Sequence, residues 1–331
     1  MSLTQRWLAR SARALGSAAE LVASQRLSVL IFHRVLAQPD PIFPGEMHAA
    51  RFEQLLAVLA EAFEVLPLSQ AVQLQSLAQL PPRALAITFD DGYADNAEIA
   101  LPLLQKQGLC ATFFVATGFL DGGRMFNDSV IETLRRSKLQ RIDLSLFGDG
   151  VRPLGSAAER CAAIEAVLKH VKYLSLAGRE EELAVLHASA GSPVLPTDLM
   201  MRSEQVRQLH QAGMEIGGHT VRHPILQVLG DEEAEQEISA GRQRLQDLIQ
   251  APVDVFAYPN GKPGQDYGRR EVEIVKRLGF KAAVSTSKGV VTPESDRFQL
   301  PRFSPWDRSA LRFAGRLLQQ RTSRAVAAVA A

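Results

Sequence analysis

The segment LAITFDDGY, residues 85–93, decides the fold. Its first five residues form a short apolar run with β-branched members, which predicts a buried strand. Asp90 and Asp91 follow directly, and Gly92 permits a tight turn after them. Polar groups at the carboxyl end of a strand are typical of the active sites of parallel α/β barrels.

Strand and helix patterns alternate on both sides of this segment, and alternation of this kind requires a parallel sheet covered by helices. The other expected strands are 28–32, 65–68, 111–116, 214–217, 253–258 and 280–285, together with a short strand in the segment QLPRF at 299–303. The expected helices are 48–63, 96–107, 203–212, 231–249 and 268–278.

The region at about 120–200 interrupts the alternation. Helical patterns fill about 127–137 and 156–190, and no strand is expected from the second of these to the next helix of the barrel at 203. We interpret this region as a helical insertion. Phe126, Asn127 and Asp128 open its first helix, where they either cap the helix or contact a substrate.

Composition narrows the class of protein. The chain has 331 residues, 46% of them hydrophobic, which suffices for one large or two modest domains with a sizeable core. Since 37 basic and 36 acidic residues leave a net charge of +1, nothing favours nucleic acid as a partner. Cys110 and Cys161 form no C-x-x-C pair, which excludes a thiolate zinc site. A metal in this protein must therefore bind to His and carboxylate groups.

The two ends of the chain are basic. Residues 1–27 are expected to form an amphipathic helix and residues 307–331 a basic helix or tail, on either side of a barrel at 28–306. These ends are either solvated helix faces or peripheral contacts with an anionic membrane surface. Because no run of 18 apolar residues and no convincing secretory signal occur, we expect a cytoplasmic protein with no obligate protein partner.

A second chemical cluster is GGHTVRHP, residues 217–224. His219 and His223 are four residues apart, close enough on one turn to share an ion, and Pro224 favours a loop over a continuing helix. Gly217 and Gly218 leave room for substrate or backbone beside them. Taken alone, either cluster has an ordinary interpretation, because Asp-Asp-Gly is also a common turn and a His pair is often incidental.

Two His and one Asp would leave coordination positions of a metal open, which is typical of catalytic rather than structural sites. A metal in such a site lowers the pKa of bound water to about 7 and polarises a carbonyl oxygen, which is the chemistry of hydrolysis. The same three ligands also suit non-haem iron oxygenases. Those enzymes need no second carboxylate beside the ligand, whereas this chain has both Asp90 and Asp91.

TFDDGY, HTVRH and FAYPNG, in this order, resemble the motifs of the polysaccharide deacetylases of the NodB-homology type, carbohydrate esterase family 4. The resemblance covers roughly Ser28 to Trp306, except the helical insertion. It implies a distorted (β/α) barrel with about seven parallel strands. It also implies removal of acetyl groups from N-acetylated sugars with one divalent metal ion, usually zinc.

The resemblance also implies roles for individual residues. By position, Asp90 is similar to the catalytic base, and Asp91, His219 and His223 to the metal ligands. Tyr258 is similar to the residue whose backbone N–H helps to hold the oxyanion. The expected substrate-binding residues are Pro259 and Asn260 at the pocket rim, Arg302 and Trp306. Trp306 either contacts the sugar or the acetyl pocket, or packs into the barrel.

Two departures from the commonest family pattern affect the site. No Arg precedes the third motif, so another basic group must orient Asp90, and the candidates are Arg302 first and Lys262 second. No histidine follows His223, whereas the usual general acid is a late His. His33 follows an expected strand and is our candidate for that role, a layout that resembles the exopolysaccharide deacetylases of the biofilm-adhesin type.

The substrate itself is not determined by these motifs. A polysaccharide, an oligosaccharide and a lipid-linked glycan present the same acetamide, and the insertion is expected to select among them. The alternatives to deacetylation are the iron oxygenase, a non-catalytic carbohydrate-binding relative and a deformylase that acts on a lipid-linked amino sugar.

Overall fold

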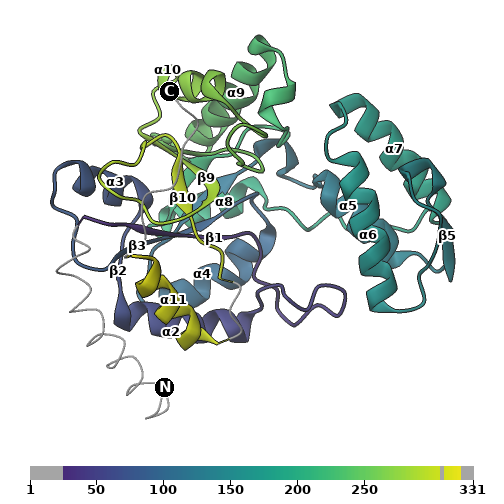
Figure 1. Ribbon diagram of the computed structural model, residues 1–331, viewed down its shortest axis with the longest axis horizontal. Helices are drawn as coiled ribbons and strands as arrows, with labels where there is room; N and C mark the ends of the chain where they lie inside the picture. The colour runs from purple at the N-terminus through teal and green to yellow at the C-terminus, as the bar shows by residue number, and fades with distance from the viewer. Residues whose placement is uncertain (1–24, 306–308, 322–331) are drawn as a thin grey trace.

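The computed structural model describes residues 25–305 and 309–321 and contains a nearly closed parallel barrel (Figure 1). Residues 1–24, 306–308 and 322–331 lie outside the described residues, which leaves out most of the predicted N-terminal helix, part of the predicted C-terminal segment and Trp306. Along the barrel wall the strands are β1 (Ser28–Phe32), β3 (Ala84–Phe89), β4 (Thr112–Val115), β7 (Glu215–Gly218), β8 (Val255–Ala257), β9 (Ala282–Lys288) and β10 (Leu300–Arg302). The two ends of this sheet meet where Phe303 exchanges backbone hydrogen bonds with Val29 and Ile31. The predicted distorted barrel of about seven parallel strands is confirmed.

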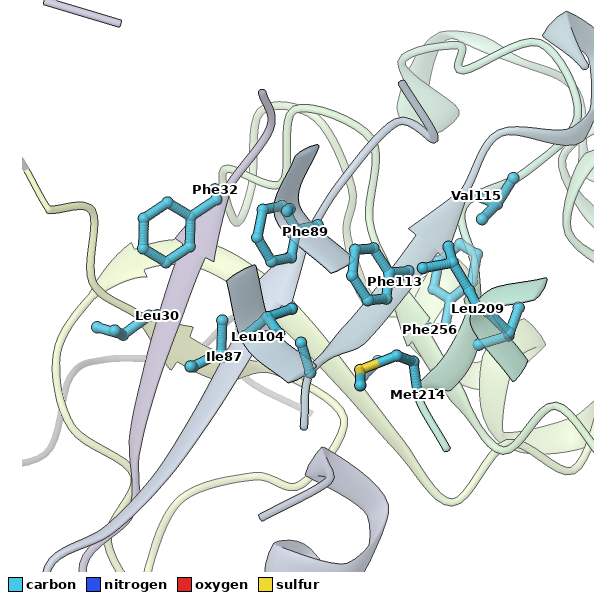
Figure 2. Packing of buried hydrophobic residues seen from close by; sticks show 14 of the residues in the cluster. Leu30, Phe32, Ile87, Phe89, Leu104, Phe113, Val115, Leu209, Met214 and Phe256 are labelled. Atoms are coloured by element: carbon cyan, nitrogen blue, oxygen red, sulfur yellow. The ribbon is translucent and has the colours of Figure 1, made fainter. Parts of the chain in front are cut away.

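Helices cover the outer face of the barrel because every second strand residue is apolar and points toward them. Phe32, Phe89 and Phe113 form a row on this face, with ring centroids 5.3 and 4.8 Å apart (Figure 2). The covering helices are α2 (Ala49–Ala62), α4 (Leu101–Lys106) after a π-helical turn (Asn96–Ala100), α8 (Ser203–Gln211), α9 (Asp231–Ile249), α10 (Arg269–Arg277) and α11 (Ala310–Gln320). Within the described part of the chain, none of the helices has the length and apolarity needed to cross a membrane.

The barrel interior is packed at one end and polar at the other. Helix α3 (Leu68–Ser76), which follows the short strand β2 (Glu64–Val65), closes the amino end, where its Leu68 N–H donates to Thr112 Oγ1. The Phe114 ring packs against Gly217, where a Cβ would lie only 2.4 Å from that ring. The expectation that this glycine leaves room for substrate is therefore wrong. Beyond this packing, Thr88 and Asp90 reach the carboxyl end of the barrel interior, where Arg302 contacts both.

The insertion forms a separate lobe beside the barrel (Figure 1). It consists of α5 (Phe126–Arg136), the antiparallel hairpin β5 (Arg141–Asp143) and β6 (Val151–Pro153), α6 (Ala157–Val171) and α7 (Leu176–Ser189). Its helices share their own buried apolar cluster. The single helical pattern expected at 156–190 is two helices, because Ser175 caps a new helix start through its hydroxyl.

Candidate active site

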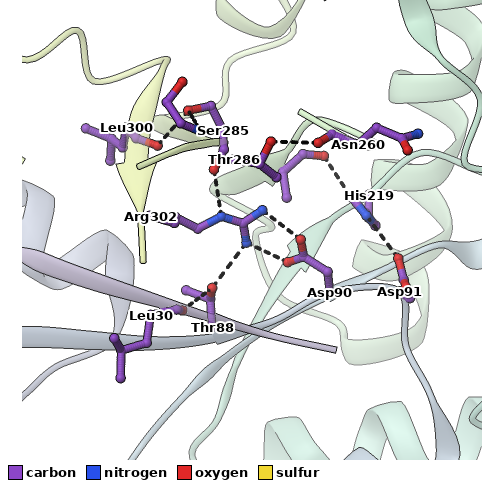
Figure 3. Close-up of polar contacts among 12 residues, drawn as sticks. Leu30, Thr88, Asp90, Asp91, His219, Asn260, Ser285, Thr286, Leu300 and Arg302 are labelled. Atoms are coloured by element: carbon purple, nitrogen blue, oxygen red, sulfur yellow. Dashed lines mark hydrogen bonds and ion pairs between the residues drawn. The ribbon is translucent and has the colours of Figure 1, made fainter. Parts of the chain in front are cut away.

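Three side chains of the types that bind metal ions converge at the carboxyl end of the barrel. Asp91 follows β3, whereas His219 and His223 lie in the loop after β7. Asp91 Oδ1 is 3.3 Å from His219 Nε2 (Figure 3). It is 3.5 Å from His223 Nε2, and one ligand atom of each of the three residues lies within 4.8 Å of the other two. The two histidines therefore lie beside a carboxylate at a strand end, as expected from the motifs, and this carboxylate is Asp91, the one that the family resemblance implies as a ligand.

The protonation states of the two histidines and of Asp91 favour the binding of a cation between these side chains. His219 Nδ1 is 2.7 Å from the carbonyl oxygen of Ala257 and donates to it, so Nε2 faces Asp91. Burial lowers the pKa of His223 to about 3, which keeps its imidazole neutral. Burial opposes a charge on His219 as well, but the nearby Asp91 and Asp90 carboxylates raise its pKa above the ordinary value. The carboxylates therefore attract positive charge to the position between the imidazoles.

Unpartnered atoms support the same conclusion. Asp91 is 5% exposed. Its Oδ1 accepts no hydrogen bond from the described residues, although two imidazoles lie nearby. Burial would raise the pKa of Asp91, but the facing histidines outweigh it and lower that pKa well below its usual range. A buried, ionised oxygen without a donor is costly unless a cation binds to it. The two histidines and Asp91 therefore fit a divalent metal ion, for which imidazole and carboxylate are ordinary ligands.

The backbone at the cluster is strained. Asp91, His223 and Asn260 have φ angles of +79°, +53° and +57°, in the left-handed region that residues other than glycine rarely adopt. Each such residue costs on the order of 1–3 kcal/mol and persists only where surrounding contacts enforce it. Strain of this kind is concentrated at functional sites.

Glu237 of α9 holds the loop that carries the two histidines. Its carboxylate is buried and accepts from the N–H groups of Val221 and Arg222, at 3.0 and 2.8 Å, and from Arg222 Nε at 2.6 Å. Gly241 lets the helix approach the loop, since a Cβ there would lie 2.8 Å from the Thr220 oxygen. Sequence analysis missed Glu237, because a glutamate in a charged helix carries no motif.

Asp90 forms a buried, bidentate ion pair with Arg302. Arg302 Nη1 and Nη2 are each 2.7 Å from one Asp90 oxygen, and its Nε donates to the Ser285 carbonyl (Figure 3). Burial by itself would raise the pKa of Asp90, but Arg302 outweighs it and lowers that pKa below its ordinary value. Arg302 is 1% exposed, so its contact is with Asp90 and not with solvent or a ligand. Lys262, the second candidate, is exposed.

Replacement of Arg302 by Met should destabilise the fold by about 3–5 kcal/mol, because a buried carboxylate loses its partner. The pKa of Asp90 should rise, which moves the acidic limb of the pH–activity profile to higher pH, since a base acts only when ionised. Urea unfolding and the pH dependence of kcat measure the two effects. The double variant Arg302→Met/Asp90→Asn is the control and should recover part of the stability. A single variant as stable as the parent would contradict the assignment.

A cavity of about 180 Å³ contains the cluster and opens to the surface. Asp90, Asp91, His219 and His223 line it together with His33, whose side chain is exposed, and Asn260. The insertion contributes Met125, Phe126 and Asn127 to its wall. Thr286, at the carboxyl end of β9, also lines it and donates to the Asn260 carbonyl. Sequence analysis missed Thr286, although its place late in a strand was a usable signal.

The remaining predicted site residues are placed differently. The Tyr258 N–H donates to the Val284 carbonyl at 3.2 Å within the sheet, so it is not available to a substrate oxygen. Its ring is buried and stacked on Tyr267, with centroids 3.9 Å apart. The expected oxyanion role of Tyr258 is therefore not compatible with this geometry. Pro259 is buried and is not among the residues that line the cavity, whereas Asn260 of the same motif lines it.

A family model described as polysaccharide deacetylase matches residues 78–143 and 165–283, more than half of the chain. Among curated proteins, the chain is 19% identical over 220 residues to the Bacillus subtilis protein YxkH, which is named as a polysaccharide deacetylase. That match covers 66% of this chain and 50% of YxkH, so the chain spans about half the length of this relative.

Solved deacetylase structures share the fold. IcaB from Ammonifex degensii has a TM-score of 0.58 at 18% identity, with 90% of this chain and 97% of IcaB covered. The Streptococcus pyogenes deacetylase PplD, in complex with acetate, has a TM-score of 0.57 at 18% identity and 84% and 92% coverage. The BpsB deacetylase domain from Bordetella bronchiseptica has a TM-score of 0.54 at 17% identity and 85% and 96% coverage.

Proposed function

Because this chain belongs to the polysaccharide deacetylase family, we propose that it hydrolyses the N-acetyl group of an amino sugar in a polysaccharide, oligosaccharide or lipid-linked glycan and releases acetate. One observation carries the proposal. A single open cavity contains a three-residue cation site, a second carboxylate fixed by an arginine and an exposed histidine. A cation site, a general base and a general acid are the groups that metal-dependent hydrolysis of an amide uses, whereas sugar binding alone needs none of them.

Asp91, His219 and His223 are the proposed ligands of the metal. We propose zinc, because two imidazoles and one carboxylate are frequent ligands of catalytic zinc. When bound, such an ion supplies Lewis acidity toward the amide oxygen and the attacking water.

Two side chains, Asp90 and His33, carry out the proton transfers of the reaction. Asp90 accepts a proton from the attacking water, and Arg302 keeps it ionised and oriented for that step. His33, which lines the same cavity, donates a proton to the leaving amine. One carboxylate and one imidazole thus act as base and acid.

The backbone N–H of Asn260 is the proposed donor to the amide oxygen as negative charge develops on it. Asn260 lines the cavity, and within residues 25–305 and 309–321 its N–H has no hydrogen-bond acceptor. The neighbouring Tyr258 N–H is already paired in the sheet. The Pro259 carbonyl, which shares a peptide group with the Asn260 N–H, accepts from the Gly261 N–H at 2.6 Å, and the bond from Thr286 Oγ1 to the Asn260 carbonyl holds Asn260 in its left-handed conformation.

Acetate release from N-acetylglucosamine oligosaccharides by the purified protein tests the function. We expect release that is independent of oxygen, is lost after chelation and returns when zinc is added. Formate release from N-formylated sugars is measured in parallel, because a deformylase would prefer them. A protein that binds zinc but releases acetate from none of these glycans would overturn the proposal.

A further inference from the structure

Two buried polar residues lie just after the motif TFDDGY, and the mechanism proposed above uses neither of them. Asp95 is the N-cap and Asn96 the first residue of the π-helical turn Asn96–Ala100. Asp95 is 7% exposed and Asn96 is fully buried. Turns of the π-helical kind are rare and occur frequently at functional sites. Both side chains contact the segment that follows β1, which carries His33.

The peptide groups on both sides of His33 are hydrogen-bonded to this part of the chain. The Phe32 carbonyl, in the peptide before His33, accepts from the Asp90 N–H at 2.9 Å. The His33 carbonyl, in the peptide after it, accepts from Asn96 Nδ2, also at 2.9 Å. The two peptide planes of a residue set its φ and ψ angles. The two bonds therefore fix the direction in which the His33 side chain leaves the backbone.

Asp95 holds the next peptide and the Asn96 amide together. Its Oδ1 accepts from the Val35 N–H and from Asn96 Nδ2, each at 3.1 Å. Its Oδ2 accepts from Arg34 Nε at 2.8 Å. Asp95 and Asn96 thus form one buried network that contacts residues 33–35.

The His33 imidazole depends on this backbone for its position. It is exposed, it lines the catalytic cavity, and within residues 25–305 and 309–321 it makes no hydrogen bond of its own. His219, in contrast, is oriented by the bond from its Nδ1 to the Ala257 carbonyl. The place of the His33 ring is therefore set by the peptides that Asp90 and Asn96 hold.

Asparagine is a costly residue at position 96 if it only fills space. Its Oδ1 is buried and has no partner among the described residues. An unsatisfied polar atom of this kind costs about 1–3 kcal/mol, which an apolar side chain of similar size would not incur. What the apolar side chain would lack is the donor to the His33 carbonyl. The role that distinguishes asparagine here is therefore the donated bond.

We propose that Asp95 and Asn96 are positioning residues for the general acid, which hold His33 where it can reach the leaving nitrogen. The proposal rests on the deacetylase function proposed above. In this step the C–N bond of the tetrahedral adduct breaks, its electron pair stays on nitrogen, and the proton of the His33 imidazolium moves to that nitrogen. The products are acetate, a free amine and a neutral imidazole. A displaced acid slows the step, because an amine anion is a poor leaving group.

The test compares two substrates that differ in the leaving group. N-acetylglucosamine oligosaccharides need protonation of the amine, whereas p-nitrophenyl acetate releases p-nitrophenolate without a proton. We expect Asn96→Leu to lower kcat/KM for the oligosaccharides about 10- to 100-fold, as follows when a catalytic group is displaced by about 1 Å. The value for the ester should change by less than about threefold. Asn96→Ser, a milder change that also removes the donor, should show the same split in case the leucine variant does not fold. Equal losses on both substrates in folded variants would overturn the proposal.

Thr112→Val is the matched control. Thr112 is buried, and its hydroxyl accepts from the Leu68 N–H at the other end of the barrel. Its replacement also removes a buried bond between a side chain and a distant backbone group, but it should leave the ratio of the two kcat/KM values unchanged. Adding Asn96→Leu to His33→Ala should cause no further loss on the oligosaccharides, because the asparagine acts through His33. A further loss of about tenfold would contradict that dependence.

NMR of isotope-labelled histidine separates this proposal from the proposed function. We expect Asn96→Leu to shift or broaden the His33 signals, which His33→Gln assigns, and to leave those of His219 in place. That result without acetate release from the parent supports the role of Asn96 in holding His33 and overturns the deacetylase function. Acetate release from the parent, with unchanged His33 signals in the variant, overturns the positioning role and leaves the function intact.

Discussion

Asp90→Asn protein is expected to release acetate with a kcat about 10²- to 10⁴-fold below that of the parent, the usual contribution of a general base. The amide has nearly the shape of the carboxylate but cannot accept the proton of the attacking water. Asp90 lies in the cavity beside the cation site and is not itself one of the three clustered ligands. Bound metal, measured by elemental analysis, should therefore stay at the parental level while kcat falls.

The control for this variant is Glu271→Gln. Glu271 is a buried carboxylate that is paired with Arg270 at 2.7 Å, but it lies on α10 and does not line the catalytic cavity. Its replacement also removes a buried carboxylate from an ion pair with an arginine, and it should change stability without changing kcat. If Asp90→Asn protein keeps parental kcat, Asp90 is not the base and the division of proton transfers proposed above is wrong.

Asp91→Asn protein is expected to lose both bound metal and acetate release. The neutral amide oxygen replaces the one anionic ligand of the cluster, and the two imidazoles alone bind a divalent ion weakly. The loss in metal affinity should exceed the roughly 10- to 100-fold that follows when only a hydrogen-bond partner of a ligand is removed. Elemental analysis after dialysis, together with acetate release at increasing zinc concentration, measures it.

Excess zinc separates a binding defect from a chemical one. Partial recovery of acetate release at high zinc would show that Asp91 acts through metal affinity, because Asp90 is intact in this variant. His210→Ala, which removes a histidine of α8 outside the cluster, should keep full metal content. An Asp91→Asn protein with parental metal content and activity would refute the assigned cation site.

Local patterns predicted much of the fold and part of the site. The apolar runs at 28–32 and 85–89 are strands as expected, and the polar residues just after them line the catalytic cavity. Periodicity predicts such elements because each depends on neighbours within a few residues. The alternation of strands and helices then brings strand ends together whatever the exact packing, which is why a carboxylate after residue 89 could be grouped with His219 and His223 from sequence. The family resemblance then selected Asp91 over Asp90 as the ligand.

Contacts between distant segments were less predictable. The candidate partner of Asp90 was one of two basic residues, and the bidentate geometry of Arg302 depends on where β10 meets β1 and β9. The choice between Tyr258 and Asn260 as backbone donor depends on which N–H the sheet has already paired. Neither fact is a property of the local sequence.

The sequence by itself determined the parallel α/β class, the metal-ligating residue types and the position of the insertion, because these follow from periodicity, composition and spacing along the chain. Only the tertiary structure decided that Arg302 fixes Asp90, that Glu237 holds the histidine loop and that Asn96 holds the backbone that carries His33. Each of these depends on which distant side chains the closed barrel brings within hydrogen-bond distance, and that is set by the packing of the whole chain.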